Sequence, residues 1–189
     1  MKRTRKKIHK QPAPQKVIEC RCSPKGVYDM INSFSPEQKI EVDKMRFSSL
    51  RAIPNWNIDR RLFLALARAF YPMTSKLELV LGEIDVTTEK ISAALGLPSV
   101  GKSFPEEWTS EQEGLIAPFK SVNRITLKEI LASKDCNVST SKGRDHFRRT
   151  FIMFLVDSFL APTSCSVTSP KHLPTIVDVQ NITIYNNYP

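Results

Sequence analysis

One stretch of the chain has the spacing of a phosphate-binding loop. The segment GLPSVGKS, Gly96 to Ser103, fits the pattern G-x4-G-K-[ST], in which backbone N–H groups and a lysine cradle the phosphates of a nucleotide. That chemistry needs a strand before the loop and a helix directly after it. Here a helix is expected before the loop, and Phe104-Pro105 follows it. A nucleotide-binding enzyme that uses Gly96–Ser103 is therefore the weaker of the functional alternatives.

Cysteine catalysis would need a histidine base and an orienting polar group. The chain has three histidines, His9, His146 and His172, and only His172 is close in sequence to a cysteine, Cys165. His146 is expected to be a surface or first-turn residue of a helix, and His172 is expected in a proline-rich loop. We therefore predict no catalytic residues.

Metal and cofactor sites are not expected either. Cys20 and Cys22 are separated by one residue, a poor spacing for zinc, and Cys136 and Cys165 have no cysteine or histidine at ligand spacing. No lysine stands in a glycine-rich or serine-rich phosphate cup, as a pyridoxal-phosphate enzyme requires. The prediction is no metal, no cofactor and no enzyme.

Length and composition indicate one domain. The chain has 189 residues, 41% of them hydrophobic, and no apolar run long enough to span a membrane. We expect a disordered basic tail at residues 1–22 and a helical domain at residues 23–189. The cysteines are expected to be reduced, in the nucleus or, as the alternative, in the cytoplasm.

The positive charge is concentrated at the start of the chain. Residues 1–25 hold nine lysines and arginines against one acid, Glu19, whereas the remaining residues are nearly neutral. The candidate nuclear-import or nucleic-acid-binding residues are Lys2, Arg3, Arg5, Lys6, Lys7 and Lys10. The partners implied are a nuclear import receptor, nucleic acid or a nuclear protein, and the plainer alternative is a solvated tail that binds nothing in particular. The oligomeric state is not predicted.

Two groups of arginines offer a second candidate nucleic-acid surface. Arg60, Arg61 and Arg68 share one expected helix. Another expected helix carries Arg144, Arg148 and Arg149. Because the globular part is close to neutral, these residues are better explained as the solvent faces of amphipathic helices.

The segment at about residues 77–86 predicts a small β-hairpin in a mainly α fold. Leucines recur at every second position at its start, the period of a strand with one buried face. Gly82-Glu83 is expected to form the two-residue turn, because glycine tolerates a positive φ. Thr87 should cap the following helix, and Gly96 should end it.

A nearly apolar segment at about residues 144–161 predicts the central helix of the domain. Its residues Phe151, Phe154 and Leu155 are expected to be covered by an amphipathic helix at residues 59–70. The hairpin is expected to pack near one end of this central helix.

Three blocks of sequence occur in a characteristic order. They are MRFSSLRAIP at residues 45–54, LELVLGEIDVTTEKISAALGLPSVGK at 77–102 and FRRTFIMFLVDSFLAPTS at 147–164. Together they resemble the plant mobile domain, also called the aminotransferase-like plant mobile domain. This family occurs in plant transposon-derived proteins, some of which are linked to a ubiquitin-like protease.

The resemblance implies a non-enzymatic nuclear domain of transposon origin that binds protein or nucleic acid and takes part in gene or transposon silencing. Relatives continue beyond a segment like Tyr185-Asn186 with a tryptophan and further helices, whereas this chain ends at Pro189. The resemblance therefore implies an incomplete, C-terminally truncated domain, with part of the central helix left exposed. The alternative is an inert fragment of a transposon protein that was once linked to a protease.

Overall fold

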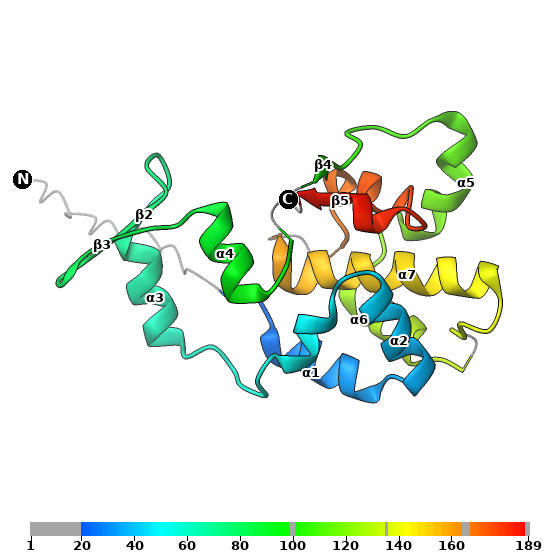
Figure 1. The fold of residues 1–189 in the computed structure, drawn as a ribbon, viewed down its shortest axis with the longest axis horizontal. Coiled ribbons are helices and arrows are strands. Elements are labelled where there is room, and N and C mark those ends of the chain that lie inside the picture. Colours follow the sequence, from blue (N-terminus) through cyan, green and yellow to red (C-terminus); the bar gives the residue numbers. More distant parts are fainter. Residues whose placement is uncertain (1–19, 99–100, 135, 164–166, 188–189) are drawn as a thin grey trace, which may run out of the picture.

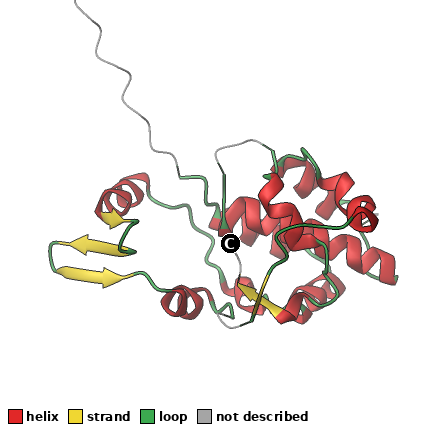
Figure 2. Cartoon of the chain, turned by 90° about the horizontal axis from the view of Figure 1, so that it is seen from above, coloured by secondary structure: helices red, strands yellow, loops and turns green. Residues whose placement is uncertain are grey.

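The computed structural model describes residues 20–98, 101–134, 136–163 and 167–187. The fold is mainly α, as predicted, with a small three-stranded antiparallel sheet. Most helices gather in one body, and a smaller unit projects from one end of it (Figures 1 and 2). In the part of the chain that is described, no helix is both long and apolar enough to cross a membrane.

The body is built around helix α7 (Ser141–Leu155), which runs through its middle (Figure 1). Thr140 caps this helix by accepting a 3.0 Å hydrogen bond from the Gly143 N–H. A Cβ on Gly143 would lie 2.4 Å from the Asn137 carbonyl oxygen, so this turn requires glycine. Every residue from Thr150 to Leu155 is buried. The predicted central helix is confirmed, and the expectation that part of its apolar surface is exposed is wrong for these residues.

Other helices surround α7 and its π-helical continuation η4 (Val156–Leu160). The longer ones are α1 (Pro24–Ser33), α2 (Pro36–Lys44) and α6 (Arg124–Ala132). The shorter ones are η1 (Ser48–Ala52), η2 (Ser110–Gln112), α5 (Glu113–Ile116), η3 (Ala117–Phe119), η5 (Pro170–Ile176) and η6 (Ile182–Ile184). Two short strands, β4 (Lys102–Ser103) and β5 (Tyr185–Asn187), pair in parallel.

Aromatic rings fill the centre of the body. The Phe34 ring meets the rings of Phe147 and Phe151 edge-on, with centroid distances of 5.2 and 5.7 Å. Phe47 meets Phe151 in the same way at 6.0 Å. The residues that cover α7 on this side therefore come from the first fifty residues of the chain, and not from residues 59–70 as predicted.

A buried carboxylate ties α2 to α7. Glu41 is 3% exposed, and its Oε2 accepts hydrogen bonds from Nε and Nη2 of Arg148 at 3.1 and 2.7 Å. Its Oε1 accepts a 2.7 Å bond from Lys44. Burial acts to raise the pKa of Glu41, but the bonds from Lys44 and Arg148 outweigh it, and the pKa lies below its usual value.

The unit that projects from the body comprises residues 56–94, and we call it the projecting unit. Its elements are α3 (Arg60–Ala69), β1 (Phe70–Tyr71), β2 (Lys76–Leu79), β3 (Gly82–Asp85) and α4 (Thr88–Leu95). Leu95, the last residue of α4, lies at the boundary with the body. Asp59 caps α3 and Thr87 caps α4, the latter as predicted. Gly96 ends α4 with φ 63° and ψ 28°, the left-handed conformation predicted for it.

The hairpin turn differs from the prediction. Leu79 pairs with Gly82, so the two turn residues are Val80 and Leu81, and Gly82-Glu83 opens the second strand. Gly82 has a positive φ of 135°, but this residue is the first of β3 and not a residue of the turn. An ion pair of 2.6 Å between Lys76 and Glu83 supports the observed register.

The projecting unit joins the body through two connecting segments that lie side by side. Ile53 before it and Leu95 at its end are half-buried against the core of the body. A Cβ on Gly96 would lie 2.6 Å from the Cβ of Ser49, so the outgoing and returning chains touch. The prediction that α3 and the hairpin pack on α7 is wrong. Helical periodicity predicts that α3 has an apolar face, but not which surface covers that face.

Candidate interaction surface

The loop with phosphate-binding spacing lacks the context that such a loop needs. Helix α4 ends at Leu95, before the loop, and Lys102 and Ser103 form strand β4 after it. The next helical turn begins only at Ser110. No helix begins directly after Lys102, so no helix N-terminus is in place to receive phosphate. The sequence predicted this, because Phe104-Pro105 follows the loop.

His172 is buried in a short helix, whereas a proline-rich loop was expected at this position. It lies in η5, and its Nδ1 is 2.9 Å from Oδ1 of Asp157 in η4. The two side chains are 8% and 6% exposed. Cys165, the cysteine close to it in sequence, lies outside the described residues. The observed partner is therefore a carboxylate, and the pair joins η4 to η5 inside the body.

Cys136 and His146 do not form a nucleophile and base pair in the described structure, and their surroundings differ. Burial raises the pKa of the Cys136 thiol to about 11, so the thiol is protonated at neutral pH and is a weak nucleophile. His146 is exposed, as expected, and its ring lies beside that of Phe119, with centroids 6.1 Å apart. Partial desolvation of the ring and the nearby Arg149 charge lower the pKa of His146. Among the described residues, no three histidine, cysteine or acidic side chains form a group that could hold a metal ion.

The two arginine groups have different surroundings. Arg148 binds Glu41, Arg149 Nε donates to the Ile176 carbonyl at 3.2 Å, and Arg144 donates to the carbonyls of Val138 and Ser139. These three arginines therefore have structural roles in the body. Arg60, Arg61 and Arg68 are exposed on α3. The predicted tail residues, Lys2, Arg3, Arg5, Lys6, Lys7 and Lys10, lie outside the described residues.

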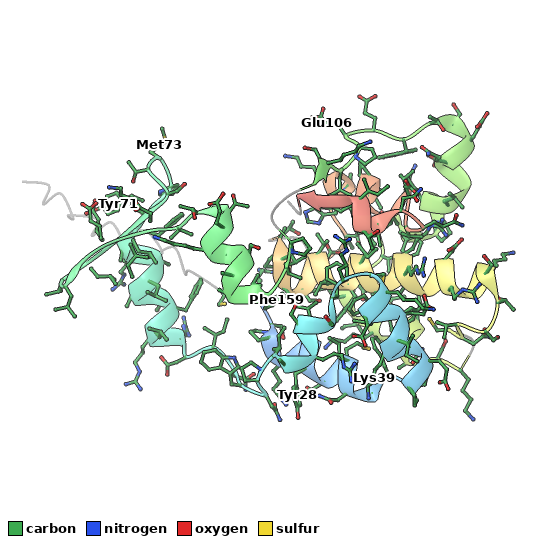
Figure 3. All side chains as sticks on the ribbon, in the orientation of Figure 1. Tyr28, Lys39, Tyr71, Met73, Glu106 and Phe159 are labelled. Carbon is green, nitrogen blue, oxygen red and sulfur yellow. The ribbon has the colours of Figure 1, made fainter. Side chains whose placement is uncertain are left out.

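The projecting unit exposes most of the large apolar side chains that the described residues leave uncovered. No residue from Arg51 to Gly96 is buried. The exposed set comprises Trp56, Leu62, Leu66, Phe70, Tyr71, Met73, Leu79, Val80, Leu81, Ile84 and Ile91. Figure 3 shows Tyr71 and Met73 on this unit, far from the body. Such a concentration of exposed apolar surface is typical of an interaction site.

Two parts of this surface differ in character. Phe70, Leu77 and Ile84 lie side by side on one face of the sheet, since Phe70 pairs with Leu77 and Leu77 with Ile84. The other face of the sheet carries Lys76, Glu83 and Asp85, of which Asp85 is the cross-strand partner of Lys76. The unit thus presents an apolar face and a charged face on one small sheet.

Comparison with known families supplies a classification. A family described as a domain of unknown function, DUF8566, matches residues 20–187. The chain belongs to this family. No curated protein and no solved structure matches it. The DUF8566 match spans the projecting unit as well as the body, so both are parts of the family's domain.

The sequence contained two indications of these features that the prediction did not use. Val80 and Leu81 are 104% and 101% exposed at a hairpin turn, a position where Gly, Asn and Asp are favoured. Large apolar residues at such a position indicate a contact surface. Asp157 directly follows the apolar run Phe151–Val156, and a buried carboxylate requires a partner, which is His172.

Proposed function

We propose that this DUF8566 chain is a non-enzymatic nuclear domain of transposon origin that binds protein through the projecting unit and serves gene or transposon silencing. The observation that carries the protein-binding part is the exposed apolar surface between Trp56 and Ile91. The resemblance to the plant mobile domain supports the origin and the role in silencing, and the basic tail supports nuclear residence.

The charges of the projecting unit favour a second copy of this chain as the bound protein. Residues 56–94 hold five basic and five acidic side chains, so two copies of the unit do not repel each other. Their signs are also separated, with arginines on α3 and most acids on the hairpin. The arginines are Arg60, Arg61 and Arg68, and the hairpin acids are Glu78, Glu83 and Asp85. A two-fold pair would place α3 of each copy against the hairpin of the other.

Sedimentation velocity of the full chain over a range of concentrations tests this proposal. We expect a reversible dimer for the natural chain and a monomer for Leu66→Glu, which places a charge in the apolar face of α3. Ile40→Glu is the matched control, because Ile40 is also an exposed apolar helix residue, 53% exposed, but lies on α2 in the body. A natural chain that stays monomeric, or two variants that behave alike, would contradict the proposal.

Nuclear residence is tested with a fluorescent fusion. At 21.5 kDa the chain itself is small enough to enter the nucleus by diffusion, so accumulation is the criterion. The full chain should accumulate in nuclei, and removal of residues 1–10 should abolish the accumulation. Equal nuclear and cytoplasmic signal for both forms would refute import by the tail.

Nucleic-acid binding is the second candidate function, favoured by the charge of residues 1–25. Fluorescence anisotropy with a labelled duplex should show affinity that falls steeply with salt, and deletion of residues 1–10 should reduce the salt dependence. The double variant Arg60→Gln/Arg61→Gln is the control, because it removes charge from α3 and leaves the tail intact.

A further inference from the structure

A pocket of about 190 Å³ lies where the start of α1, the start of α6 and the π-helical segment η4 meet. Its lining consists of Ser23, Gly26, Arg124, Ile125, Lys128 and Ser158. Two of these side chains are cations, and none is a carboxylate. A water molecule occupies about 30 Å³ in the liquid, so this pocket has room for a small polyatomic ion.

The two cations reach the pocket from consecutive turns of α6. Arg124 is the first residue of this helix, and its Nη1 donates a 3.2 Å hydrogen bond to the Arg21 carbonyl. A guanidinium has five N–H donors, so this bond leaves donors for a ligand. The Lys128 ammonium lies 5.7 Å from the centroid of the Phe154 ring and 3.5 Å from the position that a Cβ on Gly26 would take. Glycine at position 26 therefore keeps the space beside this ammonium open.

The start of α1 adds a further favourable field for an anion. Ser23 caps this ten-residue helix by accepting a 3.1 Å hydrogen bond from the Gly26 N–H. A helix N-terminus has a partial positive charge, which acidic side chains usually balance in the first turn. The first turns of α1 and α6 contain no acidic residue.

Ser158 is the independent observation that points to a ligand. It is 2% exposed, and its Oγ has no hydrogen-bond partner among the described residues. Its carbonyl oxygen accepts a 2.8 Å bond from the Ser23 N–H, which fixes Ser158 against the start of α1. A buried hydroxyl without a partner is costly and uncommon in folded proteins, and an oxygen of a bound anion would supply the missing partner.

We propose that this pocket binds a phosphate group, either as inorganic phosphate or as a small phosphomonoester. Lys128 and Arg124 donate charge-assisted hydrogen bonds to its oxygens, the Ser158 hydroxyl donates one more, and the start of α1 faces its negative charge. No bond is made or broken. The pocket belongs to the body and not to the projecting unit, so its test is independent of the proposed self-association.

Isothermal titration calorimetry of the full chain with inorganic phosphate tests the site, with sodium chloride at matched ionic strength as the reference. Lys128→Gln should weaken phosphate binding by about tenfold to a hundredfold, and Ser158→Ala by about threefold to tenfold. Lys142→Gln removes the same charge from an exposed position on α7 and should leave binding unchanged. Without phosphate, Ser158→Ala should melt at the same temperature as the natural chain or higher, which separates lost binding from lost folding.

Phenyl phosphate in a second titration distinguishes the two sources of the group. Binding of both compounds indicates a pocket open to phosphomonoesters, and binding of inorganic phosphate alone indicates a site for the free ion. Heat of the same size with chloride, or an equal loss in Lys128→Gln and Lys142→Gln, would overturn the proposal.

Discussion

Glu41 neutralises two cations from within the body, and its removal is the first test at the scale of single residues. Glu41→Ala leaves the partly buried Arg148 without its carboxylate, and we expect the free energy of unfolding to fall by about 2 kcal/mol. Asp29→Ala is the matched control, because the Asp29–Lys25 pair is exposed on α1 and should contribute less than about 1 kcal/mol. Urea denaturation of both variants measures the difference, and equal losses would show that burial of Glu41 does not matter.

His146 predicts a dependence of stability on pH. Its pKa is lowered in the folded chain by partial desolvation of the ring and by Arg149, so the unfolded chain binds a proton more readily. Stability is therefore fully present above the unfolded pKa of about 6.5 and falls as the pH drops below it. Urea midpoints between about pH 7.5 and about pH 5.5 should fall less steeply for His146→Gln than for the natural chain. Parallel pH profiles would contradict this assignment.

At this scale, sequence reasoning succeeded where the chemistry is local. The cap at Thr87 and the helix end at Gly96 depend on neighbouring residues, and the structure confirms them. It failed where a partner comes from far along the chain. The contact of His172 with Asp157 depends on how η5 folds back onto η4, which spacing does not predict.

Among the elements, α3, the hairpin and α4 should be the least protected. Residues 51–96 contain no buried side chain, whereas Thr150 to Leu155 in α7 are all buried. Low burial allows local opening without unfolding of the body. Hydrogen exchange followed by mass spectrometry should show rapid exchange in residues 60–95 and slow exchange in α7. At protein concentrations that favour the proposed dimer, protection of residues 60–95 should rise, and a rise confined to α7 would contradict the proposed surface.

The errors at the element scale have a common physical cause. The apolar periods predicted a strand pair at about 77–86, a helix at 59–70 and a central helix at about 144–161, and the structure has these elements at 76–85, 60–69 and 141–155. A period, however, specifies only that a face is apolar. The prediction assumed that the apolar face of α3 covers α7. In the structure Phe34, Phe47 and their neighbours already cover α7, and Leu62 remains 49% exposed.

For the whole molecule, the separation of body and projecting unit predicts two different responses to the loss of an apolar side chain. Phe154 is fully buried, and Phe154→Ala should reduce the free energy of unfolding by about 3–5 kcal/mol. Leu62→Ala, in the half-exposed face of α3, should change it by less than about 1 kcal/mol. Chemical denaturation at low protein concentration measures both, and a loss at Leu62 as large as that at Phe154 would mean that the two parts share one core.

The contact of Ser49 with Gly96 bears on how this architecture can change over time. The chain leaves and re-enters the body at residues that touch. The segment between them is therefore an insertion whose two ends are held together by the body. Closing a loop of a different length at such a point costs little extra entropy. This insertion can therefore be shortened, exchanged or moved to another protein, by evolution or by design, while the rest of the chain keeps its packing. Binding specificity can then diverge without any change in the body that carries the insertion.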